Sequence, residues 1–370
     1  MAADFRSDTV TKPSAAMRTA MFEAEVGDDV LDGDPTVRLL EAEAAAWLGK
    51  PRALLVPSGT MANQVALGAW TRPGDEIVCQ RWAHITTFEG GAAGFIHGVQ
   101  SLNIGGIEGR MNPDEVREAI RPNFIHCPST TLICLEQTHN VAGGLVVPME
   151  EIAEIAAIAR ERSIPVHLDG ARLANAVVAS GIAAPEWTQH ADSVALCLSK
   201  GLGAPVGSVI AGDDAFIERA MRVRKRLGGW MRQAGLVAAA ARVALAENVD
   251  RMADDHALAR DIAERLGMIE GLRTDLASVE TNMAMVHVER EGLTAADVSA
   301  ALGEHGVLVM PMGPQMLRFV THLDVGAADV EALTAAARAV MNSGTVPGTN
   351  PHYSPNPPSA GSPAEGGCGE

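Results

Sequence analysis

The chain has 370 residues, of which 47% are hydrophobic and 20% charged, so most of it is expected to fold around a large core, and a small disulfide scaffold is excluded. With 29 basic and 46 acidic residues the formal net charge is −17, which repels polyanions and argues against a nucleic-acid partner. No apolar run is long enough to cross a bilayer, and the start MAADFRSD is acidic where a signal peptide would be apolar, so we expect a cytoplasmic protein with no membrane partner.

Short apolar runs rich in β-branched residues alternate with helical patterns over the first 212 residues. Ile152, Ile155 and Ile158 repeat at the spacing of one helix face and predict a helix over 150–162. This alternation is typical of an α/β domain with a mostly parallel sheet, in which ligands bind at the carboxyl ends of the strands. The predicted strands are 53–56, 76–79, 131–136, 164–169, 193–198 and 208–212.

The second part of the chain predicts a smaller α+β domain. Residues 233–248 are rich in strong helix formers and predict a long helix leading into that domain. The elements that follow are helices over 252–267 and 294–305, a strand over 284–288, and strands in VLVMP and MLRFVTH. We therefore expect a large domain over 1–248, including the N-terminal segment 1–15, a small C-terminal domain over 249–341, and a disordered Pro/Gly-rich tail over 342–370.

Asp169 and Lys200 each end a predicted strand, in HLDGARL (167–173) and CLSKG (197–201). They are separated by about one βαβ step, so both side chains can reach one crevice. A lysine beside a carboxylate suits pyridoxal phosphate, because the lysine forms the Schiff base and the acid keeps the pyridine nitrogen protonated. A structural ion pair explains the same two residues equally well.

The segment PSGTMANQVAL (57–67) follows a predicted strand that ends at Val56. Its Ser/Gly/Thr turn leads into a helix whose free N–H groups suit a phosphate, although an ordinary N-capped helix has the same pattern. The glycines of GLGAPVG (201–207) have the wrong spacing for a dinucleotide site, and the sequence contains no P-loop. A phosphate-binding turn thus remains one of two interpretations.

Aromatic residues make up 4% of the chain, and the single tyrosine, Tyr353, lies in the predicted tail. A flat cofactor ring would therefore need a His, Phe or Trp partner, and His84 follows the strand ending at Cys79. A lone histidine is more often an ordinary surface or core residue. No HExxH motif or Cys/His cluster has metal-ligand spacing, so we expect no catalytic metal.

Two arginines are candidate partners for a substrate carboxylate, which a planar guanidinium binds bidentately. Arg172 lies about one turn past Asp169, and Arg318 lies inside an apolar run, where a charge needs a partner. The basic cluster at 222–226 is interpreted as a solvated face, with a subunit interface that helps hold phosphate as the alternative.

Ten collinear segments, from near residue 4 to about 340, resemble the low-specificity L-threonine aldolases. The resemblance implies the pyridoxal-phosphate-dependent transferase fold type I, of the aspartate aminotransferase type. It also implies a homotetramer, a dimer of dimers, with active sites at subunit interfaces. The segments are FRSDTVTKP (5–13), EVGDDV (25–30), DPTVRLLE (34–41), VPSGTMANQ (56–64), AHITTFEGGA (83–92), LEQTHN (135–140), HLDGARLANA (167–176), LSKGLGAPVGS (198–208), LGGWMRQAG (227–235) and LRFVTHLD (317–324).

The resemblance implies a pyridoxal 5′-phosphate cofactor and assigns its ligands. Lys200 becomes the Schiff-base lysine and Asp169 the pyridine partner, while Ser58, Gly59 and Thr60 hold the phosphate. The other implied cofactor contacts are His84, which stacks on the ring, Arg172, near the phenolic oxygen, and Lys225 and Arg232, which act on a neighbouring subunit's site.

The implied reaction cleaves L-threonine or L-allo-threonine to glycine and acetaldehyde. His84 and His126 take the proton of the β-hydroxyl group, a role that suits a histidine near neutral pH. Residues implied to bind the substrate carboxylate are Ser7, Arg172 and Arg318. This chemistry needs no tyrosine.

Two departures from the family pattern fall where the substrate side chain is expected. Leu31 and Asp32 stand where the family commonly has tyrosine and glycine, and Phe88 is the one aromatic residue left after the stacking histidine. A roomier pocket that accepts phenylserine is one hypothesis that follows.

The rival enzyme is a β-eliminating lyase of the same fold, which commonly uses tyrosines that this body lacks. A binding protein on a retired enzyme scaffold is a further alternative, although every candidate polar group is present.

Overall fold

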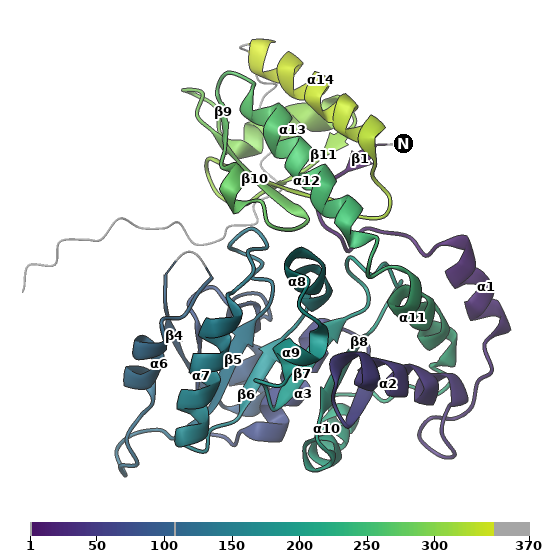
Figure 1. Ribbon diagram of the computed structural model, residues 1–370, viewed down its shortest axis with the longest axis vertical. Helices are drawn as coiled ribbons and strands as arrows, with labels where there is room; N and C mark the ends of the chain where they lie inside the picture. Colours follow the sequence, from purple (N-terminus) through teal and green to yellow (C-terminus); the bar gives the residue numbers. More distant parts are fainter. Residues whose placement is uncertain (1, 107–108, 344–370) are drawn as a thin grey trace, which may run out of the picture.

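The computed structural model describes residues 2–106 and 109–343, so most of the predicted tail over 342–370 lies outside the described residues. Figure 1 shows a large α/β body below and a smaller α+β body above, each built on its own sheet. Within the described ranges, no helix is both long and apolar enough to cross a membrane.

The large body is built on a seven-stranded sheet with the order β2-β8-β7-β6-β5-β3-β4. Strand β8 runs antiparallel to both of its neighbours, and the pairs from β7 to β4 are all parallel, which confirms the expected mostly parallel sheet. The strands are β2 (Arg52–Val56), β3 (Glu76–Gln80), β4 (Gln100–Ile104), β5 (Thr130–Glu136), β6 (Val166–Asp169), β7 (Ser193–Cys197) and β8 (Ser208–Gly212).

All six strands expected in this body are present, and β4 is an additional strand that the sequence pattern did not predict. Its sequence, QSLNI, contains no buried residue because β4 lies at the edge of the sheet. An edge strand with polar, exposed side chains carries no apolar run for sequence reasoning to detect.

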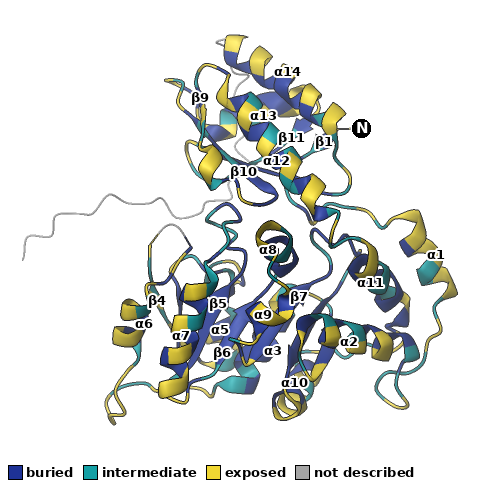
Figure 2. Ribbon diagram, in the orientation of Figure 1, coloured by how far each residue is buried: buried dark blue, intermediate teal, exposed yellow. Residues whose placement is uncertain are grey.

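Helices cover both faces of the large sheet, whose strands are buried between them in Figure 2. Leu55 belongs to the apolar cluster that includes α2, α7 and α11, whereas its neighbour Leu54 belongs to the cluster with α3 and α10 on the opposite face, as the two-residue period of a strand requires. The helices are α1 (Ala15–Glu23), α2 (Pro35–Leu48), α3 (Gly59–Trp70), α4 (His84–Thr87), α5 (Ala92–His97), α6 (Pro113–Ala119), α7 (Met149–Glu161), α8 (Leu173–Ser180), α9 (Ala184–Thr188), α10 (Asp214–Arg226) and α11 (Gly235–Glu247).

The smaller body packs three helices against an antiparallel sheet with the order β12-β13-β10-β9. The domain boundary predicted after residue 248 falls between α11 and α12. The elements are α12 (Met252–Gly267), β9 (Leu272–Thr274), a short 3₁₀ helix (Leu276–Ser278), β10 (Met283–Val288), α13 (Ala295–Glu304), β11 (Val307–Leu308), β12 (Met310–Pro311), β13 (Met316–Val320) and α14 (Ala327–Ser343).

The first residues of the chain belong to the smaller body, which corrects the placement of segment 1–15 in the large domain. Strand β1 (Ala3–Asp4) pairs in parallel with β11, and Phe5 is fully buried with its ring 6.2 Å from that of Phe319. The segment then crosses to the large body, where α1 packs on α11. A two-residue strand has no local periodicity, so the sequence around it cannot indicate which sheet it joins.

Candidate active site

Three of the predicted site residues lie at the carboxyl edge of the large sheet, where parallel sheets bind their ligands. Asp169 ends β6, Lys200 lies in the turn after β7, and His84 begins α4, shortly after β3. The backbone N–H of His84 donates to Glu136 Oε2 at 2.7 Å, which attaches the start of α4 to the end of the neighbouring strand β5. The strand ends thus fix the positions of these side chains.

A cavity of about 460 Å³ opens at this edge between the two bodies. Lys200 and His84 reach it from the large body, and Arg318 reaches it from β13 of the smaller body. The complete lining is Ser7, Thr9, His84, Phe88, Asn140, Arg172, Lys200, Met310, Pro311, Met312 and Arg318. The cavity therefore brings an amine, an imidazole and two guanidinium groups together.

Asp169 is buried at the base of this region. Its Oδ2 atom accepts a hydrogen bond from Asn63 Nδ2 at 2.7 Å, and Oδ1 accepts one from the backbone N–H of Ala171 at 3.0 Å. Burial alone would raise the pKa of Asp169, but His84, Lys200 and the Asn63 amide outweigh it, so the pKa is lowered. A carboxylate that stays ionised in a buried position is suited to pair with a cation.

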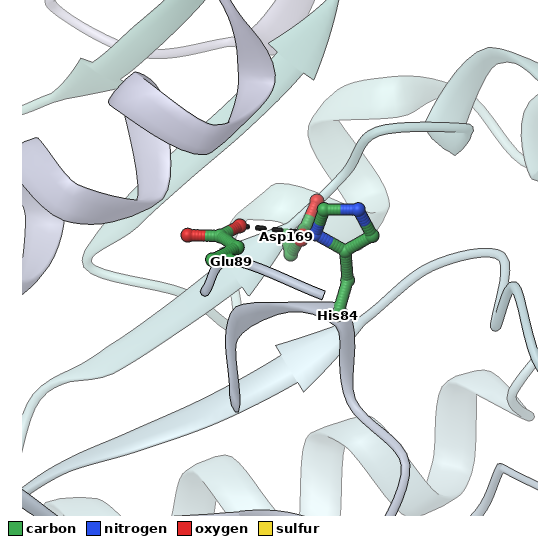
Figure 3. A group of neighbouring side chains, drawn as sticks. All are labelled: His84, Glu89 and Asp169. Atoms are coloured by element: carbon green, nitrogen blue, oxygen red, sulfur yellow. Dashed lines mark hydrogen bonds and ion pairs between the residues drawn. The ribbon is translucent and has the colours of Figure 1, made fainter. Parts of the chain in front are cut away.

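His84 has an acidic partner that the sequence reasoning did not identify. Figure 3 shows Glu89 beside the imidazole, with His84 Nδ1 3.0 Å from Glu89 Oε1. Burial lowers the pKa of His84. The hydrogen bond to Glu89 and the charge of Asp169 raise it by more, so the net shift of the pKa is upward. The Phe88 ring lies 5.6 Å from the imidazole, at the cavity wall.

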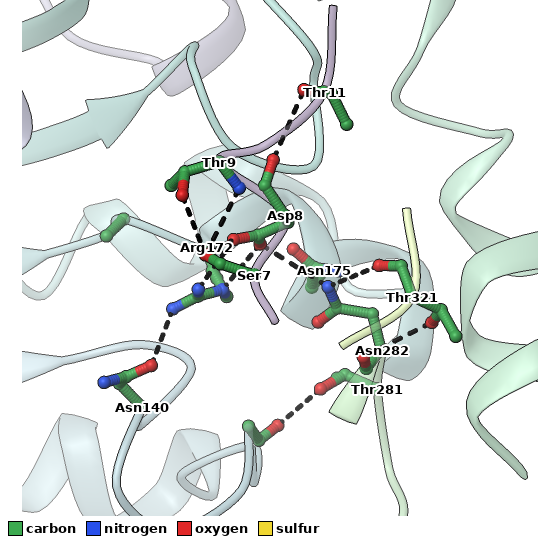
Figure 4. Close-up of polar contacts among 12 residues, drawn as sticks. Ser7, Asp8, Thr9, Thr11, Asn140, Arg172, Asn175, Thr281, Asn282 and Thr321 are labelled. Carbon is green, nitrogen blue, oxygen red and sulfur yellow. Dashed lines mark hydrogen bonds and ion pairs between the residues drawn. The ribbon is translucent and has the colours of Figure 1, made fainter. Parts of the chain in front are cut away.

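The two arginines have different partners, which Figure 4 shows for Arg172. Arg172 donates through Nε and Nη2 to the two carboxylate oxygens of Asp8, both at 2.8 Å, and the two side chains are buried. Arg318 shares Asn140 Oδ1 with Arg172, and its Nε has no partner among the described residues. Burial lowers the pKa of Arg318 to about 10, which leaves it charged at neutral pH. Arg318 is therefore the arginine with a free donor at the cavity.

The turn before α3 has the N-capped geometry that both interpretations expect, so phosphate binding there stays a prediction. Ser58 caps the helix by accepting from the N–H of Met61 at 3.1 Å. Gly59 begins the helix, and a Cβ atom at this position would lie 2.6 Å from Cys197 Sγ. Only glycine allows this close approach of α3 to β7. The helix N-terminus supplies a partial positive charge near the same sheet edge.

The structure does not bring every predicted site residue to the cavity. His126 is exposed, with its ring 5.0 Å from that of Phe124, and it is not among the lining residues. Lys225 and Arg232 are also exposed, and Arg232 forms an ion pair with Asp28 at 2.8 Å. The structure of a single chain therefore does not test the roles predicted for these three residues, which stay predictions.

Arg224 corrects the interpretation of the basic cluster at 222–226 as a solvated face. Its side chain is 3% exposed, donates to the carbonyl oxygen of Leu55 at 2.8 Å and stacks on Trp230. Arg224 lies beside Val223 and Ala220 among the buried residues of α10, so it faces the core side of the helix.

The ligand atoms of His84, Glu89 and Asp169 lie within 4.8 Å of one another, a spacing that suits a metal ion. These atoms already form hydrogen bonds, because Asn63 Nδ2 donates to Glu89 Oε1 at 2.7 Å as well as to Asp169. The Asn63 NH₂ group donates to the carboxylates of both Glu89 and Asp169, and these hydrogen bonds explain why the two carboxylates lie close together. The expectation of no catalytic metal stays a prediction.

Asp8, Asn63, Glu89 and Asn140 are the site residues that sequence reasoning missed. Each lies inside a segment that was recognised as a motif. The partners of Asp8, Asn63 and Asn140 are distant in the chain, whereas Glu89 is near its partner His84. Asp8 and Arg172, for example, are 164 residues apart. No local spacing indicates such a pair, and a buried acid in a motif without an obvious role is the one available signal.

Comparisons with known proteins agree with this geometry. The sequence matches the beta-eliminating lyase family over residues 4–291. It is 44% identical to the low-specificity L-threonine aldolase 1 of Arabidopsis thaliana, covering 91% of this chain and 96% of the relative. It is 43% identical to the low specificity L-threonine aldolase of Escherichia coli K12, covering 91% and 99%.

The fold also matches solved structures. The Leishmania major threonine aldolase superimposes with a TM-score of 0.78 at 18% identity, covering 92% of this chain and 99% of that one. At that identity the likeness concerns the fold alone, so the assignment depends on the sequence matches. The chain therefore belongs to the beta-eliminating lyase family, and its similarity over nearly the whole length places it beside the low-specificity L-threonine aldolases.

Proposed function

We propose that this enzyme cleaves L-threonine and L-allo-threonine to glycine and acetaldehyde, with pyridoxal 5′-phosphate as cofactor. The observation that carries the proposal is the cavity, which combines the Lys200 amine, the His84 imidazole and the Arg318 guanidinium. An amine can hold the cofactor, an imidazole can accept a proton, and a guanidinium can bind a carboxylate. Relatives named as threonine aldolases support the choice of substrate.

The residues present fit this cofactor. Buried, ionised Asp169 matches a protonated pyridine nitrogen, and Lys200 is near enough to lower the pKa of Asp169 by its charge. The turn formed by Ser58, Gly59 and Thr60 offers helix N–H groups to a phosphate. The pyridine nitrogen and the phosphate, at opposite ends of the cofactor, thus each have a complementary partner.

When bound, the cofactor supplies an electron sink for the bond between Cα and Cβ of the substrate. The protein orients the substrate: Arg318 binds the α-carboxylate through its free Nε, and Arg172 and Ser7 line the same part of the cavity. His84 packs against the ring and accepts the proton of the β-hydroxyl group, while Glu89 stabilises the imidazolium that results.

A product assay tests this function. The purified protein with pyridoxal 5′-phosphate is incubated with each isomer of threonine, and glycine, acetaldehyde and pyruvate are measured separately. Equimolar glycine and acetaldehyde support the aldolase. Pyruvate or 2-ketobutyrate without glycine would indicate a β-eliminating lyase instead. Comparable kcat/KM values for threonine and phenylserine would support the roomier pocket, and strict preference for threonine would contradict it.

Covalent trapping tests the role of Lys200. Borohydride reduction of the loaded protein is expected to fix the cofactor on the peptide that contains Lys200, and Lys200→Ala is expected to lose both colour and activity. Lys12→Ala, which changes an exposed lysine outside the cavity lining, serves as the control and should retain both. A label on another lysine would contradict the assignment.

We also propose that the active form is a homotetramer in which Lys225 and Arg232 complete a neighbour's site. Both side chains are exposed and cannot serve their own cavity in the arrangement described. Lys200→Ala and Arg232→Ala, each inactive alone, should recover part of the activity when refolded together, because one site in a mixed pair is intact. Absence of recovery in mixed oligomers, confirmed by sedimentation, would contradict a shared site.

His126 remains a proposed second base. His126→Ala should lower kcat with little change in cofactor affinity if the exposed segment around it moves to the substrate. An unchanged kcat would remove His126 from the mechanism.

A further inference from the structure

A chain of hydrogen bonds, buried except at its Trp70 end, runs behind Asp169, away from the cavity. Trp70 Nε1 donates to Ser193 Oγ at 2.9 Å, and Ser193 Oγ lies 3.0 Å from His167 Nδ1. His167 Nε2 lies 3.0 Å from Asn63 Oδ1, and Asn63 Nδ2 reaches Asp169 Oδ2 at 2.7 Å. None of the first four residues lines the cavity, so none contacts a substrate there directly.

The ends of this chain fix its direction. The indole N–H of Trp70 can only donate, and an ionised carboxylate can only accept. The Asn63 amide must therefore turn its NH₂ group to Asp169 and its oxygen to His167. It follows that His167 carries its proton on Nε2 and accepts the Ser193 hydroxyl proton at Nδ1. Every hydrogen bond in the chain then points toward Asp169.

The branch at Asn63 connects two carboxylates. The second hydrogen of the same NH₂ group is donated to Glu89 Oε1 at 2.7 Å, and Glu89 Oε2 accepts from Gln64 Nε2 at 2.6 Å. Without an N–H group between them, two buried carboxylates this close would repel, and one would take up a proton. Asn63 thus supports the partner of His84 and the partner of the cofactor together.

Burial of the histidine agrees with this arrangement. His167 is fully buried, and burial lowers its pKa to about 4, although the nearby Asp169 opposes that shift. His167 is therefore neutral at pH 7 and has one donor and one acceptor nitrogen, as the chain requires.

We propose that Trp70, Ser193, His167 and Asn63 form a one-directional hydrogen-bond relay that keeps Asp169 ionised and thereby sets how tightly the site binds a pyridinium ring. The proposal rests on the proposed cofactor. Members of the relay act through Asp169 and Glu89, so they are positioning residues. Successive hydrogen bonds that point the same way polarise one another in a buried site, which extends the effect of Trp70 to the carboxylate.

Other groups also act on Asp169 and must be held constant in any test. They are His84 of α4, Lys200 after β7, Glu89 after α4, and the thiols of Cys134 and Cys197. Asn63→Ala also removes a hydrogen bond to Glu89, whereas Ser193→Ala and Trp70→Phe remove no hydrogen bond of these groups.

The test consists of three measurements. The first two compare Asn63→Ala, Ser193→Ala and Trp70→Phe with the wild type. The Kd of the apoprotein for pyridoxal 5′-phosphate at pH 7 is expected to rise on the order of tenfold for Asn63→Ala, since hydrogen bonds to charged groups contribute about 1.5 kcal/mol or more. Smaller increases are expected for the two distal variants. The pH at which the loaded protein loses cofactor on dialysis should move upward in the same order, because loss of the donor raises the pKa of Asp169.

The third measurement uses the protein without cofactor. Nitrogen NMR of the wild-type apoprotein should show His167 as the neutral tautomer with its proton on Nε2. Trp187→Phe is the matched control: Trp187 is buried and donates through Nε1 to Ile182 O at 3.3 Å, but it is outside the relay. Trp187→Phe should lose the cofactor at the same acidic pH as the wild type.

Two results would overturn the relay. One is a His167 tautomer with its proton on Nδ1. The other is that all three relay variants, while folded, lose the cofactor at the same acidic pH as the wild type. These outcomes differ from failure of the proposed function, in which the wild-type protein itself binds no pyridoxal 5′-phosphate. In that case the tautomer of His167 would still test the direction of the hydrogen bonds in the relay.

Discussion

Arg318 and Arg172 both line the cavity, but their guanidinium groups are in different states. All three nitrogens of Arg172 donate to Asp8 or Asn140, whereas Arg318 has its Nε donor without a partner in the described part of the chain. A buried cation with a free donor is costly to the folded protein unless a ligand occupies it. At the residue scale, this difference supports the proposal that Arg318 contributes more than Arg172 to binding of the carboxylate.

Arg318→Lys is accordingly expected to raise KM for threonine on the order of a hundredfold with a smaller fall in kcat, because one donor atom of a buried charge pair contributes about 2–5 kcal/mol. A lysine cannot reproduce the planar fork. Steady-state kinetics checks this, with circular dichroism to confirm folding. A change confined to kcat would contradict carboxylate binding by Arg318.

Glu89 affects the pH dependence of the reaction through His84. Burial lowers the pKa of His84, the Glu89 hydrogen bond raises it, and the net shift is upward. If neutral His84 is the base, the acid limb of kcat/KM follows this pKa, so Glu89→Gln should move that limb to lower pH. Glu43→Gln, at a half-buried acid that pairs with Arg242 away from the cavity lining, is the control and should leave the limb in place. A profile unaffected by Glu89→Gln would separate Glu89 from the base.

At the element scale, the N-terminus of α3 has a structural role and the proposed phosphate-binding role. Ser58→Ala and Thr294→Ala remove equivalent helix caps, the first at the site and the second at the start of α13. Each change should lower stability by about 1 kcal/mol. Only Ser58→Ala should also weaken cofactor binding, because only α3 points toward the predicted phosphate. Urea unfolding and cofactor titration of both variants measure the two effects, and equal cofactor affinities would contradict phosphate binding at α3.

The regular elements were largely predictable because their signals are local. Ile152, Ile155 and Ile158 repeat along the sequence and are all buried on α7. Edge strand β4 and two-residue β1 were not predictable, since one has a polar sequence and the other is too short for a period. The same distinction applies to the site. Residues at strand ends could be found from the ends of apolar runs, whereas hydrogen-bond partners such as Asp8 come from distant segments.

At the scale of the whole molecule, Asp8 joins three parts of the chain. It follows β1, pairs with Arg172 of the large body and accepts from Asn282 Nδ2 of the smaller body at 3.4 Å, contacts shown in Figure 4. Burial raises the pKa of Asp8, but Arg172 outweighs it and lowers the pKa well below the usual range. The ion pair therefore contributes to the relative placement of the two bodies as well as to the cavity wall.

Asp8→Asn should reduce the free energy of unfolding by about 3–5 kcal/mol at pH 7, the usual effect of breaking a buried ion pair. Because the folded-state pKa of Asp8 is depressed, its contribution is fully present above the unfolded value of about 3.9 and declines as the pH falls toward the folded value. Urea unfolding at several pH values should show the difference from wild type shrinking below about pH 4. A difference independent of pH would indicate that packing, and not charge, accounts for the loss.

The pairing of β1 with β11 also has a consequence for the order in which the protein is made. Ala3 is translated about 300 residues before its partner Val307, and Phe5 is translated similarly long before Val320, whose N–H donates to Phe5 O. The large sheet, complete at Gly212, can form while the N-terminal segment still waits for its partner strand. Ser7 and Asp8 belong to that segment. The cavity wall formed by Ser7 can therefore be completed only after the strands of the smaller body have been translated.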